Sequence, residues 1–162
     1  MTAIRNHLHG GFTLIELVVT LAILSMLSTV ALPMAELTVQ RGKEQELHAA
    51  LRQIRDAIDA YKQAYDEGHI TRKVGASGYP PTLDVLVQGV TDALSPKEQK
   101  LFFLRRLPRN PFVHDSNIPA AQTWGKRSYT SNADDPQEGD DVFDVYSAVP
   151  GIGINGVPYK EW

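Results

Sequence analysis

The sequence predicts an α+β fold in which one long N-terminal helix packs on a small C-terminal antiparallel sheet. An apolar run over residues 12–32 continues into an amphipathic helical pattern that ends near residue 67, and short alternating segments separated by Gly and Pro turns follow only later. The length of 162 residues fits one modest domain plus an appendage. We therefore divide the chain into a leader (1–11), a membrane helix (12–32), a stalk helix (33–67) and a globular head (68–162).

The composition argues against several classes of function. Charged residues make up 22% of the chain and the net charge is −3, with no block rich in Lys or Arg, so a nucleic-acid partner is not predicted. There are no cysteines, which excludes disulfides and cysteine metal sites. The sequence has no HExxH, GxSxG or P-loop spacing, and His114-Asp115 is a common dipeptide. We expect a protein that is not an enzyme.

The apolar run FTLIELVVTLAILSMLSTVAL is long enough to cross a bilayer, at about 31 Å for a helix. A buried core helix is one alternative, but the length and the N-terminal position of the run argue against it. A secretory signal peptide is another, yet its apolar region is usually shorter and is followed by a small-residue cleavage site. Here Gly10-Gly11 precedes the run, so cleavage at that point would leave the helix on the protein.

Glu16 is the only charged residue in the membrane helix. A charge at this depth is costly and marks a functional residue by default. One interpretation is a carboxylate near the interface that reaches the headgroups. The interpretation that we prefer begins with cleavage between Gly11 and Phe12. The new Phe12 ammonium and the Glu16 carboxylate of a neighbouring subunit would then neutralise each other in an apolar bundle and set the axial register.

The flanks of the membrane helix predict its orientation and a bend. Arg5 precedes the span and favours a cytoplasmic N-terminus, which places the head outside the inner membrane. Pro33 lacks a helix hydrogen bond and clashes with the preceding turn, so we expect a kink there.

The stalk carries one apolar stripe at alternating spacings of four and three residues. It consists of Leu47, Leu51, Ile54, Ile58, Tyr61 and Tyr65. The stripe predicts a helix that packs on the protein's own sheet, with a coiled-coil seam as the alternative. Gly68 is a suitable cap for its C-terminal end.

The head is expected to contain two short helices before its strands. The first covers residues 82–94, and the second begins at Ser95-Pro96, which reads as an N-cap with Pro at the first helical position, and runs to about residue 104. Residues 107–112 form a rigid turn with two prolines.

Two strands are expected near the end of the chain, over residues 127–131 and 142–147, with a polar acidic turn between them. Asn155-Gly156 is a strong turn signal. We expect Trp162 to pack back on the core.

The segment Gly11-Phe12-Thr13-Leu14-Ile15-Glu16, followed by its apolar run, resembles the class III signal of type IV pilin-like proteins. The resemblance implies a pilin-like fold, cleavage between Gly11 and Phe12 by prepilin peptidase on the cytoplasmic face, and N-methylation of Phe12 by the same enzyme.

Motifs in the head are similar in order to those of the major pseudopilin of type II secretion systems. They are Tyr79-Pro80, Leu107-Pro108-Arg109-Asn110-Pro111-Phe112, Trp124-Gly125, Val142-Phe143-Asp144-Val145-Tyr146-Ser147 and the glycine-rich end with Trp162. The resemblance implies a single-pass inner-membrane protein with a periplasmic head. It would form a filament with itself and other pseudopilins, contact the assembly platform, and help to move folded proteins across the outer membrane.

One feature departs from that family. Its major pseudopilin typically binds calcium in a C-terminal loop, but the matching residues 148–159 contain no Asp or Glu here. Calcium prefers several oxygen ligands, including carboxylates, so we expect no cofactor at that loop. Asp140, Asp141 and Asp144 lie just upstream, either in a solvated turn or as a displaced calcium site.

Two other functions stay open from the sequence. A type IV minor pilin for adhesion or DNA uptake carries the same N-terminal signal, although DNA uptake favours a basic head. The second of these functions is that of a membrane-anchored domain that never polymerises.

Overall fold

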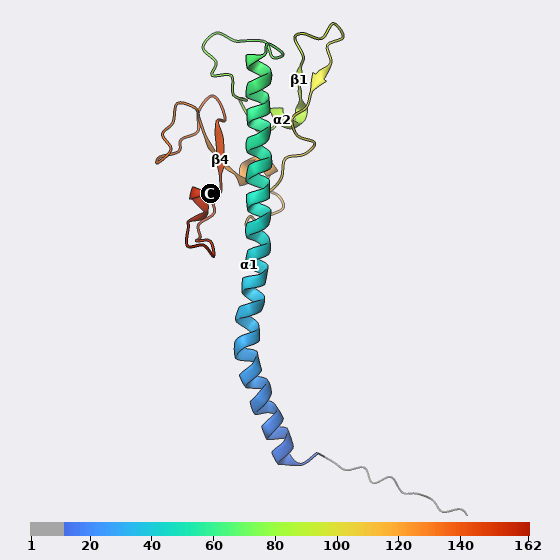
Figure 1. Ribbon diagram of the computed structural model, residues 1–162, viewed down its shortest axis with the longest axis vertical. Coiled ribbons are helices and arrows are strands. Elements are labelled where there is room, and N and C mark those ends of the chain that lie inside the picture. The colour runs from blue at the N-terminus through green and yellow to red at the C-terminus, as the bar shows by residue number, and fades with distance from the viewer. Residues whose placement is uncertain (1–11) are drawn as a thin grey trace, which may run out of the picture. The chain divides into compact units, whose positions relative to one another are not determined.

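The computed structural model describes residues 12–162, except for the side chains of residues 30–33, and it confirms the α+β fold class (Figure 1). The chain divides into two units, residues 1–40 and 41–162. Helix α1 (Leu14–Asp66) supplies the described part of the first unit and enters the second. Everything that follows α1 belongs to the second unit. From here on, the head means this whole unit, residues 41–162, which adds the C-terminal part of α1 to the range predicted from the sequence.

Within the head, α1 is the element against which the rest of the chain packs. The predicted stripe of Leu47, Leu51, Ile54, Ile58 and Tyr61 is buried, and Tyr65 is half-buried at its end. The stripe faces the core of its own chain, which confirms intramolecular packing over the coiled-coil alternative.

Gly68 ends α1 as predicted from the sequence. Its φ is +88°, its N–H donates to the Tyr65 oxygen at 3.2 Å, and the His69 N–H donates to the Ala64 oxygen at 2.9 Å. These two bonds form a Schellman motif, in which a left-handed glycine satisfies the last helical carbonyls.

The two expected helices of residues 82–104 are only partly correct. Helix α2 (Val85–Gln88) is a single turn within the first expected range. A two-stranded antiparallel sheet replaces the end of the first expected helix and the second one. Its strands are β1 (Val90–Thr91) and β2 (Lys100–Leu101), with Val90 opposite Leu101.

The expected helix at Ser95-Pro96 is wrong because tertiary hydrogen bonds hold this segment in a hairpin. Ser95 Oγ accepts the Lys97 N–H at 3.4 Å, so it supports a turn. The Leu86 oxygen accepts both the Phe103 and Leu104 N–H groups, at 3.1 and 2.9 Å, which fixes the returning chain beside α2. A helix would have used those N–H groups within itself.

A second two-stranded sheet confirms strands near both predicted places. Strand β3 (Gly125–Arg127) begins two residues before the expected range and ends where that range began, and it pairs antiparallel with β4 (Asp144–Tyr146). Gly125 leaves room for the Tyr146 ring at this pairing, because a Cβ there would lie 2.4 Å from Tyr146 Cζ. A short 3-10 turn, η1 (Ala120–Thr123), precedes β3. A second 3-10 turn, η2 (Tyr159–Glu161), lies near residue 162.

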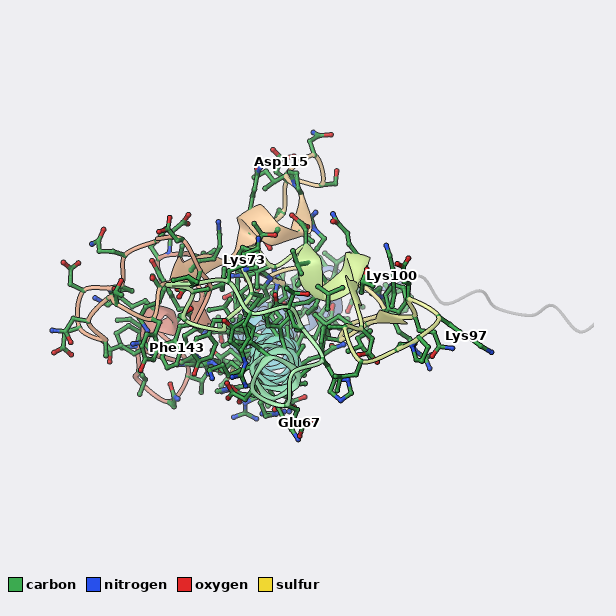
Figure 2. The ribbon with its side chains drawn as sticks, turned by 90° about the horizontal axis from the view of Figure 1, so that it is seen from above. Glu67, Lys73, Lys97, Lys100, Asp115 and Phe143 are labelled. Atoms are coloured by element: carbon green, nitrogen blue, oxygen red, sulfur yellow. The ribbon has the colours of Figure 1, made fainter. Side chains whose placement is uncertain are left out.

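The two hairpin regions lie on different sides of α1 in the head. Seen from above, Phe143 next to β4 and Lys97 and Lys100 at the β1–β2 hairpin point away from the helix in different directions (Figure 2).

The segment between the sheets crosses the core through Asn110, which is 1% exposed. Trp124 Nε1 donates to the Pro108 oxygen at 2.9 Å, so the predicted two-proline turn is held against the start of β3.

Candidate functional site

The N-terminal half of α1 presents an apolar surface that nothing in the described chain covers. Leu14, Ile15 and Met26 are 66 to 83% exposed, and the side chains described over residues 12–39 are exposed throughout. The helix is long and apolar enough to cross a membrane. A continuous exposed apolar face of this kind marks a surface that contacts a membrane or another protein.

Hydroxyl side chains in this part of α1 are compatible with an apolar environment. Thr20, Ser25, Ser28 and Thr29 each donate to a main-chain oxygen three or four residues earlier, at 2.7 to 2.9 Å. A hydroxyl bonded to the preceding turn does not need water or a distant partner.

Glu16 lies in the first turn of α1 and forms a capping box with Thr13. Its Oε2 accepts both the Thr13 N–H and the Thr13 Oγ1–H at 2.8 Å, while its own N–H donates to Thr13 Oγ1 at 3.3 Å. The pattern Thr-x-x-Glu before an apolar run is the sequence signal for this motif, and the sequence analysis missed it. The box fixes the carboxylate at the N-terminal end of the helix, next to Phe12.

The other predicted residues of this region stand as follows. Phe12 is 89% exposed and directly precedes the capping box. Gly11 and residues 1–10 lie outside the described residues, so the cleavage and methylation sites stay predictions. Pro33 lies within the bounds of α1, and the kink expected there also stays a prediction.

This chain is similar to known proteins, first over the N-terminal part of this helix and then over most of its length. Residues 6–32 match the prokaryotic N-terminal methylation motif. The chain is 24% identical to the type II secretion system core protein G of Klebsiella michiganensis over 85% of this chain and 92% of that protein. It is 26% identical to the protein of the same name from Aeromonas hydrophila, over 82% and 87%.

The long N-terminal helix and the two small antiparallel sheets that follow it are consistent with a pilin-like fold. The resemblance to type II secretion pseudopilins is confirmed by the methylation motif together with these two relatives. No significant match to a solved structure was found.

Two acidic residues of the head, Asp141 and Asp144, are bonded to protein donors. Asp141 accepts from the Ser77 hydroxyl, from the Ser128 hydroxyl at 2.7 Å and from the Tyr129 N–H at 2.9 Å. Asp144 pairs with Arg55 Nε at 2.8 Å and Arg127 Nη2 at 3.3 Å.

These contacts occupy two of the three carboxylates of the displaced calcium site with protein donors, and that site stays a prediction. Asp140 is exposed, and the carboxylates of Asp141 and Asp144 are held in separate networks. Among residues 12–162, no group of three or more His, Asp or Glu side chains is arranged to hold a metal ion. The acidic turn supplies structural hydrogen bonds and ion pairs.

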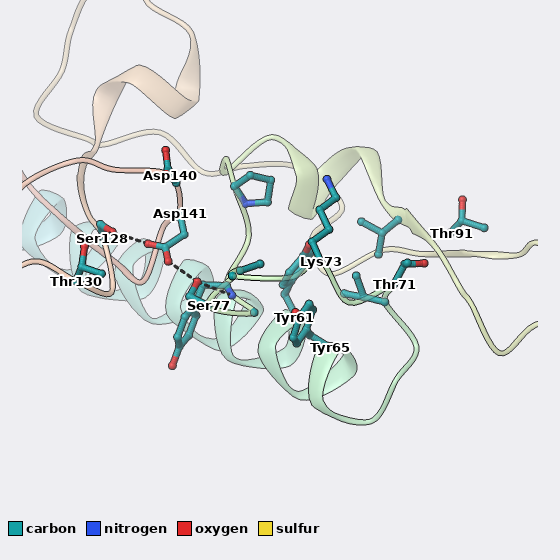
Figure 3. Close-up of a pocket in the computed structure, with 17 residues that line it drawn as sticks. Tyr61, Tyr65, Thr71, Lys73, Ser77, Thr91, Ser128, Thr130, Asp140 and Asp141 are labelled. Atoms are coloured by element: carbon teal, nitrogen blue, oxygen red, sulfur yellow. Dashed lines mark hydrogen bonds between the residues drawn. The ribbon is translucent and has the colours of Figure 1, made fainter.

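Asp141 also lines a cleft in the head with a volume of about 610 Å³ (Figure 3). Tyr61, Tyr65 and Lys73 lie across the cleft from it. Burial raises the pKa of Asp141, but the hydrogen bonds from Ser77, Tyr129 and Ser128 together outweigh it and hold the pKa below its ordinary value. The carboxylate is therefore charged at neutral pH and ties the loop at Ser77 to the start of the acidic turn.

Residues that the sequence analysis did not connect also order the head. Asn110 Nδ2 donates to Ser147 Oγ at 2.9 Å, and its Oδ1 accepts the Phe112 N–H at 3.0 Å. Asn-Pro indicates a turn, but no sequence signal identifies a partner 37 residues away.

Proposed function

We propose that this chain is a structural, non-enzymatic subunit of a type II secretion pseudopilus. Prepilin peptidase would cleave it between Gly11 and Phe12 and methylate the new amine. The processed chain would polymerise through its N-terminal helix with itself and other pseudopilins. The filament would act with the inner-membrane assembly platform to move folded proteins across the outer membrane.

The observation that carries this proposal is the exposed apolar helix that begins with the Thr13–Glu16 capping box. The described residues leave its apolar surface uncovered, and the methylation motif covers the same region. A simple anchor needs no carboxylate in the first turn, whereas a bundle of helices gains from pairing it with the Phe12 ammonium of a neighbour. Arg5, which precedes the span, supports a cytoplasmic N-terminus and a periplasmic head.

The capping box sharpens the role of Glu16, because it provides a second reason for a carboxylate at this position. Within one chain, Glu16 completes the cap with Thr13. Between chains, it would neutralise the Phe12 ammonium. The first role needs an oxygen acceptor and the second needs a negative charge, so substitutions can separate them.

Filament assembly in cells tests this proposal directly. Glu16→Gln keeps an oxygen that can cap Thr13 but removes the charge, and Thr13→Ala removes the cap hydroxyl but keeps the charge. We expect Glu16→Gln and Glu16→Ala to abolish filaments recovered by shearing, while Thr13→Ala retains them.

Glu36→Ala is the matched control, because Glu36 is an exposed carboxylate on the same helix beyond the membrane segment, and it should assemble like the parent. Membrane levels and intact mass of each variant are measured first, so that a failure of insertion or cleavage is recognised. Assembly of Glu16→Ala at the parental level would refute the pairing. Loss of assembly in Thr13→Ala together with retention in Glu16→Gln would assign Glu16 to capping alone.

A further inference from the structure

We infer that α1 fastens the tail segment, residues 148–162, through Glu44, His48 and Arg55, and that the tail is therefore ordered without a calcium ion. The three side chains are spaced by four and seven residues, which places them on one side of a helix. The C-terminal end of the chain lies beside α1 in the head (Figure 1).

Glu44 is the innermost of these contacts. The residue is 9% exposed, and its Oε1 accepts the Ile154 N–H at 3.0 Å and the Tyr159 hydroxyl at 2.9 Å. A buried carboxylate is stable only when it is hydrogen-bonded or paired. Both of these donors come from the tail segment, so burial of Glu44 and order in the tail depend on each other.

His48, one turn further along α1, stacks on Trp162. The ring centroids are 4.0 Å apart and the planes differ by 8°. Trp162 Nε1 also donates to the Val157 oxygen at 3.3 Å, which joins the two ends of the last turn. Gly153 leaves room for the Trp162 ring, since a Cβ at residue 153 would lie 2.3 Å from Trp162 Cζ2.

Arg55 connects the tail segment to strand β4. Its Nη2 donates to the main-chain oxygens of Val145 and Trp162, at 3.0 and 2.7 Å, while Nε pairs with Asp144. The planar guanidinium can make these bonds together because its donors have fixed directions. One side chain of α1 thus holds both strand β4 and the end of the tail segment.

The polarity of the tail segment is the reverse of what a calcium site requires. Calcium gathers oxygen ligands, with carboxylates among them, whereas residues 148–159 contain no carboxylate and direct an N–H and an O–H at Glu44. Two main-chain oxygens of the tail are also engaged: Gly151 accepts the Tyr159 N–H at 3.1 Å and Val157 accepts the Gly153 N–H at 2.9 Å. The family's calcium loop therefore does not fit this chain, and contacts with α1 take its place.

Hydrogen exchange measured by mass spectrometry on the full chain in detergent tests the absence of a calcium requirement. We expect peptides from residues 148–162 to exchange at the same rate with millimolar calcium and with excess chelator. Slower exchange with calcium, or faster exchange with chelator, in this segment would overturn the inference.

The same measurement tests the role of Glu44. In Glu44→Ala, the Ile154 N–H and the Tyr159 hydroxyl lose their acceptor, so we expect roughly tenfold faster exchange in the tail segment. Glu46→Ala is the matched control, because Glu46 is an exposed carboxylate two residues away on α1, and it should exchange like the parent. Parental exchange in Glu44→Ala would contradict the role given to this side chain.

If Glu44→Ala does not fold, His48→Ala provides the second test, because His48 is exposed and its substitution leaves the core intact. We expect faster exchange in residues 148–162 and parental exchange in α1. Unchanged exchange in the tail would overturn the inference. These results do not depend on polymerisation, so they are independent of the assembly test for Glu16.

Discussion

Individual polar side chains, rather than a large sheet, join the distant segments of this head. Asn110, Glu44 and Asp141 each bond to residues far away in the sequence. Their residue types were visible in the sequence, but their partners depend on how the loops fold over α1. The Thr13–Glu16 box differs because both partners lie within one turn, and its spacing alone could have predicted it.

Asp141 gives a testable pH dependence at the residue scale. Its pKa in the folded head is lowered below the unfolded value of about 3.9. A lowered folded pKa contributes stability that is complete above the unfolded pKa and is lost as the pH falls through the folded pKa. Asp141→Ala should therefore destabilise the head at neutral pH by about 1 kcal/mol, with solvent limiting the effect.

Thermal unfolding followed by near-ultraviolet circular dichroism measures this effect. The difference between the parent and Asp141→Ala should be constant near neutral pH and should shrink below about pH 4. Asp140→Ala is the control, because Asp140 is next to Asp141 in the sequence and its carboxylate is exposed. A difference that stays the same down to about pH 3 would show that Asp141 acts only through packing.

At the scale of elements, the sequence was most informative for α1 and least informative for the β1–β2 hairpin. The apolar stripe of α1 repeats over several turns, so its periodicity predicted the helix, its buried face and the glycine at its end. Strands of two residues are too short to show alternation. Ser95-Pro96 resembles a helix start locally. The hydrogen bonds that the returning chain donates to the Leu86 oxygen override this local preference for a helix.

Gly89 is the residue that makes this hairpin possible. Its φ is +75°, and a Cβ there would lie 2.8 Å from the Leu101 main-chain oxygen. Gly89→Ala should destabilise the head by about 1–3 kcal/mol through backbone strain and this clash. Hydrogen exchange at Asp92 and Phe103, whose N–H groups hold the hairpin, should accelerate.

Gly75→Ala separates the two causes. Gly75 has a φ of +82°, but a Cβ there would meet nothing within 4 Å. Its substitution carries the backbone strain without the clash, so it should lower the unfolding midpoint less than Gly89→Ala does. Equal losses would show that the close approach to Leu101 contributes nothing.

At the scale of the whole molecule, the sequence predicted the α+β fold class and the resemblance to pseudopilins. The apolar run, its single carboxylate and the amphipathic continuation are local patterns. They predicted the long helix that enters the head, and its N-terminal part is apolar enough to cross a membrane. The fastening of the tail segment was not predictable from the sequence. Glu44, His48 and Arg55 are residue types that usually lie on a helix surface, and only the folded tail makes them its partners.

Polymerisation of the processed chain through its N-terminal helix is checked by the intact mass of the subunit recovered from sheared filaments. We predict filaments that contain this chain beginning at Phe12 and carrying one added methyl group. Absence of the chain from every filament fraction, or its presence there with residues 1–11 still attached, would contradict the account.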